Sequence, residues 1–259
     1  MRAAVLGRPI AHSLSPVLHR AAYAALGLDW TYDAVEVGAD GLPAFLEHLD
    51  DDWAGLSLTM PLKHAVLPLL DTCSELATAV AAANTVVLDE RGRHGHNTDV
   101  AGMVVSLREA GASRVASPVV LGGGATARSA LAALAELGCR TPVLVVRSHP
   151  AETLAAAARL GVSPTVRAFT PQVLGGCDLL ISTLPPVVAD PFSQYVGDVP
   201  LLLDVVYDPW PTALAEGCGG VVVSGAQMLL HQAAAQVELM TGRPAPIEAM
   251  RDALDGLKA

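Results

Sequence analysis

Short β-branched runs alternate with longer stretches rich in alanine and leucine along most of the chain. The short runs predict nine strands, because strands are short and favour β-branched residues. The alternation predicts an α/β fold with mostly parallel sheets, and nine strands favour two sheets over one. We place these strands at residues 3–6, 31–37, 55–58, 85–88, 119–121, 143–146, 179–182, 201–206 and 221–223.

Helices are predicted between most of these strands. Residues 16–26 begin with Pro16 in the first turn, with Ser15 as a possible N-cap, and stop before Gly27. Further helices are predicted at 99–110, 227–239 and 247–257. A new strand–helix–strand unit begins near Val119, so the segment before it forms a first domain. The two C-terminal helices have no strand after them and can pack on either domain.

Composition narrows the class of protein. The 259 residues carry a formal charge of -10, which disfavours a nucleic-acid partner. No apolar run approaches the roughly 18 residues of a membrane helix, and the first apolar run is too short for a signal peptide. We therefore expect a cytoplasmic protein without a membrane partner. The cysteines form no CxxC pair and no cluster with zinc spacing, so no metal is expected; they are Cys73, Cys139, Cys177 and Cys218.

A glycine-rich loop follows the strand predicted at 119–121. Gly122, Gly124 and Ala127 fit the pattern G-x-G-x-x-A, and a helix follows. In this context the glycines permit a tight turn and close approach of a pyrophosphate to the helix N-terminus. The alternative is a plain glycine turn in an apolar α/β unit. The strand–loop–helix order favours a dinucleotide site.

The tip of the next strand indicates which dinucleotide binds. An NAD site usually has Asp or Glu there, whereas this strand ends Val-Val-Arg147-Ser148-His. A guanidinium suits a 2′-phosphate, which it can hold by paired hydrogen bonds. NADP is therefore favoured over NAD, with a merely solvent-exposed Arg147 as the alternative.

Three segments of the first half are unusually polar. Residues 7–16 place Ser13 and Ser15 before a helix, where hydroxyls can hold a carboxylate or simply cap the helix. Residues 55–63 end at Lys63, one of two lysines in the chain; a surface lysine is the plain alternative. Residues 83–85 and 95–102 contain Asn84 and Asp99, and Asp99 can also serve as a helix cap.

Together with two C-terminal segments, these motifs resemble the shikimate dehydrogenase family. Its pattern runs approximately GxPIxHSxSPxxHN, GxNVTxPxK, NT, GxNTDxxG, a glycine loop, DxxYxPxxT and GxxMLxxQ. The matches occur in order from Gly7 to Gln232. Arg20 and Ser57 stand where the pattern has Asn, and Ala125 where a glycine is common. Val146 and Ala151 stand in a stretch that is usually richer in basic residues.

The resemblance implies reversible reduction of 3-dehydroshikimate to shikimate with NADP. It implies a substrate-binding domain at 1–98, a Rossmann-type NADP-binding domain at 99–228, and helices at 229–259 that return to the first domain. Lys63 and Asp99 are the implied catalytic pair, with Asp99 orienting Lys63. The implied substrate-binding residues are Ser13, Ser15, Thr59, Lys63, Asn84, Asp99, Tyr207 and Gln232. The implied cofactor-binding residues are Gly122, Gly123, Gly124, Ala125, Thr126, Ala127, Arg147, Ser148, Thr183, Val205, Gly225 and Met228.

Other functions remain open at this stage. An NAD-dependent quinate/shikimate dehydrogenase is the nearest rival, and Arg147 argues against it. A methylene-tetrahydrofolate dehydrogenase has a large aromatic substrate, which the hydroxyl- and amide-rich set fits poorly. A non-catalytic nucleotide sensor would not need both Lys63 and Asp99. We expect a monomer or a homodimer.

Overall fold

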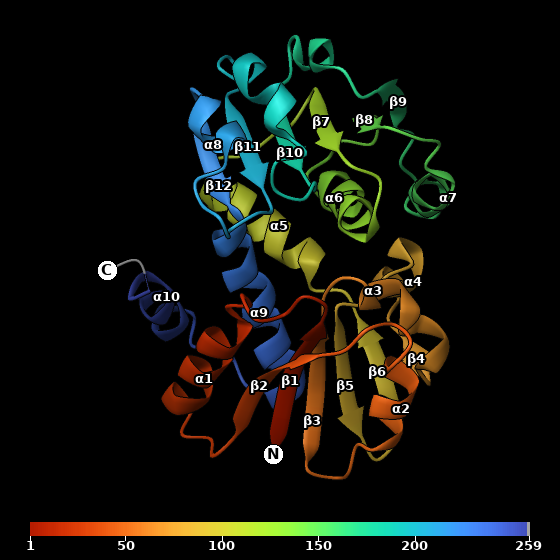
Figure 1. The fold of residues 1–259 in the computed structure, drawn as a ribbon, viewed down its shortest axis with the longest axis vertical. Helices are drawn as coiled ribbons and strands as arrows, with labels where there is room; N and C mark the ends of the chain where they lie inside the picture. The colour runs from red at the N-terminus through yellow and green to blue at the C-terminus, as the bar shows by residue number, and fades with distance from the viewer. Residues whose placement is uncertain (258–259) are drawn as a thin grey trace. The chain divides into compact units, whose positions relative to one another are not determined.

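The computed structural model describes residues 1–257 and divides them into two compact units (Figure 1). The first unit combines Met1–Thr98 with the segment that starts at Leu229. The second unit is Asp99–Met228. Each unit contains one six-stranded sheet flanked by helices, which confirms the predicted α/β fold class.

The sheet of the first unit is mixed. Its order is β2-β1-β3-β5-β6-β4, with bounds β1 Arg2–Gly7, β2 Thr31–Glu36, β3 Trp53–Leu58, β4 Thr72–Cys73, β5 Thr85–Asp89 and β6 Gly92–His96. β1 is parallel to β2 and β3, whereas β5 is antiparallel to β3 and β6. The prediction missed β4 and β6. β4 has two residues, and β6 reads Gly-Arg-His-Gly-His without an apolar run.

Six helices of the first unit are α1 (Ser15–Ala25), α2 (Leu42–Glu47), α3 (Leu62–Ala65), η1 (Leu67–Leu69), α4 (Glu75–Val80) and α10 (Ile247–Asp255). Helix α1 packs against α10. The N-cap of α1 is Leu14, so Ser15, a possible N-cap from the sequence, does not cap this helix. Ser15 is instead the first residue of the helix, and Pro16 follows within the first turn, where its missing N–H costs no helical hydrogen bond.

Helix α9 (Gly225–Thr241) begins in the second unit and continues into the first, where it lies close to strand β3. A Cβ atom at Gly55 would lie 2.6 Å from the Val86 carbonyl oxygen and 2.9 Å from Cγ of Met240. Glycine at position 55 therefore allows the Met240 side chain of α9 to pack directly against strand β3. The predicted return of the C-terminal helices to the first domain is thus confirmed.

The sheet of the second unit is parallel throughout. Its order is β12-β11-β10-β7-β8-β9, with bounds β7 Pro118–Leu121, β8 Val143–Val146, β9 Thr165–Ala168, β10 Leu179–Ser182, β11 Leu201–Asp204 and β12 Val221–Ser224. Numbered within this unit, the order is 6-5-4-1-2-3, which is that of a Rossmann-type sheet. Strand β9 was missed because all four of its residues are exposed and it lacks a buried apolar face.

Helices of the second unit connect these strands: α5 (Asp99–Glu109), α6 (Ala125–Glu136), α7 (Ala151–Arg159), η2 (Pro171–Leu174), η3 (Asp190–Tyr195) and α8 (Ala213–Gly217). Helix α6 contacts β7, α5 and α7. The apolar core beneath the sheet includes Leu121, Val145, Leu180 and Phe192, all fully buried. Strands β7, β10 and β11 read as continuous apolar runs because both of their faces are covered.

The four cysteines are free. The two absences expected from the sequence, of a metal site and of a membrane helix, can be compared with residues 1–257. This part of the chain contains no group of three or more His, Cys, Asp or Glu side chains placed to hold a metal ion. None of its helices combines the length and apolar character that a membrane crossing needs.

Candidate functional site

The polar segments of the first unit meet at one edge of its sheet. Strands β1 and β3 both end at this edge, because they run parallel. Strand β5 begins there, because it is antiparallel to β3 and pairs Thr85 with Ser57. Segments far apart in sequence therefore contribute Ser13, Thr59, Lys63 and Asn84 to the same edge.

Main-chain hydrogen bonds hold these segments together. Thr59 N–H donates to the Leu6 carbonyl at 2.9 Å, and a Cβ at Gly7 would collide with the Thr59 side chain. Glycine at position 7 is thus needed for Thr59 to sit beside β1. Ala83 N–H donates to the Lys63 carbonyl at 2.8 Å, which ties α3 to the turn before Asn84.

Asn84 is a buried hub of this edge, with 1% of its surface exposed. Its Nδ2 donates to Oε1 of Gln232 at 3.1 Å and to Oγ1 of Thr98 at 2.9 Å. Gln232 lies on α9, 148 residues further along the chain. The structure therefore brings together Asn84 and Gln232, two of the predicted substrate-binding residues.

Ser13 and Ser15 lie at the start of α1. Ser15 is 4% exposed, and its N–H donates to the Ser13 hydroxyl oxygen at 3.4 Å. The Ser15 carbonyl accepts from Nδ1 of His19 at 3.0 Å. Burial lowers the pKa of His19 to about 4, so this ring is neutral near pH 7. His19 therefore brings no charge to the two serines.

The predicted cofactor residues of the second unit follow the carboxyl ends of its parallel strands. Gly122 follows β7, Arg147 follows β8, Thr183 follows β10, Val205 follows β11 and Gly225 starts α9 directly after β12. The strand order reverses between β7 and β10. In an open α/β sheet this reversal marks the crevice where ligands bind.

The glycine loop has the geometry that the motif predicts. Gly122 has φ +112°, and a Cβ there would collide with the Thr183 hydroxyl. Gly124 is the N-cap of α6. Because glycine has no side chain, it cannot cap the first N–H groups of the helix, which continues through Ala125, Thr126 and Ala127. The first N–H groups of α6 can therefore receive an anionic ligand.

A cavity of about 530 Å³ adjoins this loop. Gly122, Gly123, Arg147 and Ser148 all line it. The exposed Arg147 guanidinium lies 5.4 Å from the ring centroid of Phe169, a cation–π distance that steadies the side chain. This lining fits a nucleotide with a phosphate near Arg147.

Two residues beside this loop and its cavity were not foreseen from the sequence. Thr153 on α7 donates its hydroxyl proton to the Gly123 carbonyl at 2.6 Å, and Phe169, which follows the missed strand β9, lines the cavity. Neither residue belongs to a recognisable motif. Their positions follow from the sheet order, which places β9 beside β8.

Tyr207 lies in the segment between β11 and α8, and Asp204 organises that segment. The Asp204 carboxylate accepts from Thr212 Oγ1 at 2.7 Å and from Val206 N–H at 3.2 Å. Burial raises the pKa of Asp204, which the hydrogen bonds from Thr212 and Val206 oppose. The Asp–x–x–Tyr–x–Pro–x–x–Thr spacing thus closes a loop that carries Tyr207.

Asp99 and Met228 are both buried, and both lie at unit boundaries in the sequence. Asp99 is the first residue of α5 and is 3% exposed. Met228 lies in α9 and is 7% exposed. The pairing of Asp99 with Lys63 and the contact of Met228 with a cofactor stay predictions.

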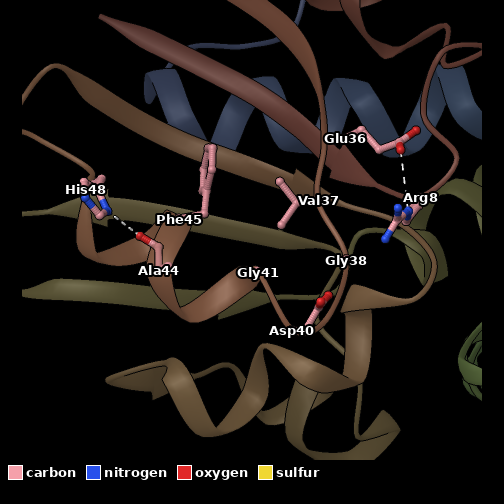
Figure 2. Close-up of a pocket in the computed structure, with 9 residues that line it drawn as sticks. All are labelled: Arg8, Glu36, Val37, Gly38, Asp40, Gly41, Ala44, Phe45 and His48. Atoms are coloured by element: carbon pink, nitrogen blue, oxygen red, sulfur yellow. Dashed lines mark hydrogen bonds and ion pairs between the residues drawn. The ribbon is translucent and has the colours of Figure 1, made fainter.

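A second cavity, of about 540 Å³, lies in the first unit around the loop between β2 and α2 (Figure 2). Arg8 and Glu36 lie next to each other at one end of it and form a 3.5 Å ion pair, and both side chains are more than half exposed. Nδ1 of His48 donates to the Ala44 carbonyl at 2.6 Å. The predicted substrate-binding residues are absent from the lining of this cavity.

Comparison with protein families gives two matches. Residues 5–86 match the family described as shikimate dehydrogenase substrate binding domain. Residues 225–254 match the one described as shikimate 5'-dehydrogenase C-terminal domain. Both segments contribute to the first unit, and the Asn84–Gln232 hydrogen bond joins them.

Individual proteins are similar over nearly the whole chain. Shikimate dehydrogenase (NADP(+)) of Moorella thermoacetica is 36% identical over 95% of this chain and 90% of its own length. The crystal structure of Mycobacterium tuberculosis shikimate dehydrogenase is 43% identical, with a TM-score of 0.91, and covers 98% of this chain and 99% of its own. The shikimate 5-dehydrogenase of Thermus thermophilus, in complex with NADP(H) and shikimate, is 32% identical, with a TM-score of 0.85 and 99% coverage of both chains.

Proposed function

The chain belongs to the shikimate dehydrogenase family, and we propose that it catalyses the reversible, NADP-dependent reduction of 3-dehydroshikimate to shikimate. This is an oxidoreductase reaction at a CH–OH group, and it serves the biosynthesis of chorismate and the aromatic amino acids. We assign substrate binding to the first unit and NADP binding to the second.

The Asn84–Gln232 hydrogen bond is the observation that carries this proposal. It joins the two segments that match shikimate dehydrogenase families, and it lies at the sheet edge that also receives Thr59 and Lys63. Buried amides and hydroxyls at one edge suit a ligand with several hydroxyl groups, because each hydroxyl can both donate and accept. Ser13 and Ser15 suit the carboxylate of the same ligand.

The second unit fits NADP. A side chain at Gly122 would collide with Thr183, so the turn needs glycine there, whereas nothing lies within 4 Å of a Cβ at Gly124, where the backbone is open to close approach and α6 presents its N-terminus. Arg147 provides a cation beside the cavity at the tip of β8, where an NAD site usually has a carboxylate. When bound, the cofactor supplies or removes the hydride.

Lys63 is the residue that we assign to proton transfer. Reduction of the ketone adds a hydride to carbon and a proton to oxygen, so a nearby acid must stabilise and protonate the developing alkoxide. The Lys63 ammonium donates this proton in reduction, and the neutral amine takes it back in oxidation. We assign Asp99 to orienting Lys63 and to accepting a hydrogen bond from a substrate hydroxyl.

Steady-state turnover tests the proposed function directly. The absorbance of the reduced nicotinamide is followed with shikimate or quinate and with NADP or NAD. We expect the highest kcat/KM with shikimate and NADP. A protein that turns over none of the four combinations would contradict the proposal.

Substitution of either serine should weaken substrate binding. Ser13→Ala and Ser15→Ala each remove a hydroxyl that can bond a charged carboxylate, at a cost of about 1.5–3 kcal/mol. We expect KM for shikimate to rise in both variants while KM for NADP stays the same. Ser106→Ala is the control, because the Ser106 hydroxyl is also buried and donates to the Met103 carbonyl. An unchanged KM for shikimate in both variants would contradict the role in carboxylate binding.

Removal of the Arg147 guanidinium should selectively weaken NADP binding. Arg147 is exposed, so its contact with a 2′-phosphate is worth less than a buried ion pair. We expect Arg147→Ala to raise KM for NADP by roughly ten- to a hundredfold, the value of a charged hydrogen bond. KM for NAD should barely change, because NAD lacks this phosphate. The preference of the wild type for NADP should also shrink as salt rises.

Arg140→Ala is the matched control for Arg147→Ala. Arg140 is also exposed and lies before β8, at the opposite end of the strand, where its guanidinium donates to the carbonyls of Leu160 and Gly161. It should leave both cofactor constants unchanged. Equal losses for NADP and NAD in Arg147→Ala would instead assign Arg147 to the fold or to the shared pyrophosphate. A wild type that prefers NAD would overturn the choice of cofactor.

A further inference from the structure

A continuous network of buried polar side chains lies in the first unit, at the sheet edge that carries Asn84. It reaches from strand β2 through β3 to the start of β5 and to helix α9. Its members are Tyr32, Ser57, Asn84, Thr85, Thr98, Gln232 and Gln236, all at most 6% exposed. Asn84 and Gln232 are predicted substrate-binding residues, whereas Gln236 lies outside the sequence motifs.

A main-chain N–H fixes the orientation of Asn84. Thr98 N–H donates to Oδ1 of Asn84 at 2.7 Å, and an N–H group can only donate. The oxygen end of the amide therefore faces Thr98 N–H, and Nδ2 faces Gln232. Gln232 must in turn accept with Oε1, at 3.1 Å, which leaves its Nε2 as the end available for donation. Within the protein this Nε2 has two acceptors at long hydrogen-bond distances. They are the Leu229 carbonyl oxygen at 3.3 Å and Oε1 of Gln236 at 3.5 Å.

A main-chain carbonyl fixes the orientation of Gln236 in the same way. Nε2 of Gln236 lies 3.2 Å from the Asn84 carbonyl oxygen and 3.0 Å from Oγ1 of Thr85. Because a carbonyl only accepts, this end of Gln236 must be the amino group. Thr85 then donates its own proton to Oδ1 of Asn84 at 3.0 Å. Gln236 thus supports Asn84 both at its main chain and, through Thr85, at its side chain.

The other end of Gln236 faces strand β3. Its Oε1 accepts from the Ser57 hydroxyl at 2.9 Å, and Ser57 accepts from the Tyr32 hydroxyl at 2.5 Å. Burial raises the pKa of Tyr32, so this hydroxyl keeps its proton. Ser57 stands where the family pattern has Asn, and Gln236 brings an amide to that position from another element.

We propose that Gln236 is a positioning residue for substrate: it holds the Asn84 and Gln232 amides so that Gln232 presents an N–H donor to an oxygen of a substrate ring hydroxyl. The inference rests on the proposed function for the identity of that substrate. Apolar replacement of Gln236 leaves Ser57, Thr85 and the Asn84 carbonyl each short of one partner. These groups then compete for the Asn84 and Gln232 amides, and the presented donor is lost.

Gln236→Met tests this proposal, because methionine has a similar length and cannot donate to a carbonyl. We expect KM for shikimate to rise about tenfold, which corresponds to the loss of about one buried hydrogen bond to the substrate. The value of kcat should change by less than about threefold, and KM for NADP should stay the same. Ser57→Ala is a milder variant that removes the hydroxyl donor to Gln236. It should raise KM for shikimate in the same direction by a smaller factor.

Val237→Ala is the matched control, because Val237 is fully buried on the same helix and removal of its methyl groups disturbs packing without removing a hydrogen bond. It should lower Tm and leave KM for shikimate unchanged. An unchanged KM in folded Gln236→Met, or an equal rise in Val237→Ala, would overturn the positioning role.

A second measurement does not depend on turnover. In nuclear magnetic resonance spectra the side-chain NH₂ protons of Asn84 and Gln232 should exchange slowly in the wild type and faster in Gln236→Met. Unchanged exchange overturns the proposal even if KM rises. A wild type that does not oxidise shikimate contradicts the proposed function instead, while the amide exchange still reports whether Gln236 holds the two side chains.

Discussion

Lys63→Ala should lower kcat by about 10²–10⁴-fold, the usual contribution of a positioned general acid. Without the ammonium no side chain at this position protonates the developing alkoxide, so the loss falls on the chemical step. KM for shikimate should change much less, because the hydroxyl and amide contacts of the ligand remain. Single-turnover and steady-state rates with shikimate and NADP measure both quantities.

His64→Ala is the control for Lys63→Ala. His64 is the next residue of α3, is exposed, and donates from Nδ1 to the Ala81 carbonyl at 3.3 Å. Its loss disturbs the same short helix and should leave kcat close to the wild-type value. A folded Lys63→Ala protein with near-wild-type turnover would remove Lys63 from the reaction.

The α/β class could be predicted because short β-branched runs alternate with helical stretches, and the clearest of these runs are buried on both faces. Strands β7, β10 and β11 are fully buried and were predicted within a few residues of their observed bounds. The elements that were missed lack this signal: β6 is glycine- and histidine-rich, and β9 is fully exposed. The antiparallel course of β5 depends on its pairing with β3, which no local pattern encodes.

The candidate site likewise contains some residues that a sequence motif reveals and others that no motif reveals. Gly122 could be singled out because its positive φ and the contact with Thr183 require glycine, and such a requirement leaves a motif. Gln236 left no motif, because its role depends on Ser57, which lies 179 residues earlier in the chain. The sequence offered Ser15 as a possible N-cap of α1 because serine before proline is a common cap signal, but Leu14 takes that position. The structure starts the helix one residue earlier.

Asp99→Asn should produce a loss of kcat comparable to that of Lys63→Ala. The substitution keeps the shape of the side chain and removes the negative charge to which we assign the orientation of the lysine ammonium and the hydrogen bond from a substrate hydroxyl. Asp99 is buried at the first turn of α5, so the exchange leaves no exposed surface for water to compensate. Asp178→Asn is the control: Asp178 accepts from the N–H groups of Ala116 and Ser117, and its loss should affect Tm and not kcat.

The double variant Lys63→Ala/Asp99→Asn separates a cooperating pair from two independent residues. If both side chains serve one proton transfer, removal of the first already abolishes what the second contributes. The double variant should then lose less than the sum of the two single losses, expressed as activation free energies, and its rate should lie close to that of the slower single variant. Strict additivity of the two losses would show that Lys63 and Asp99 act independently, and would assign Asp99 to substrate binding alone.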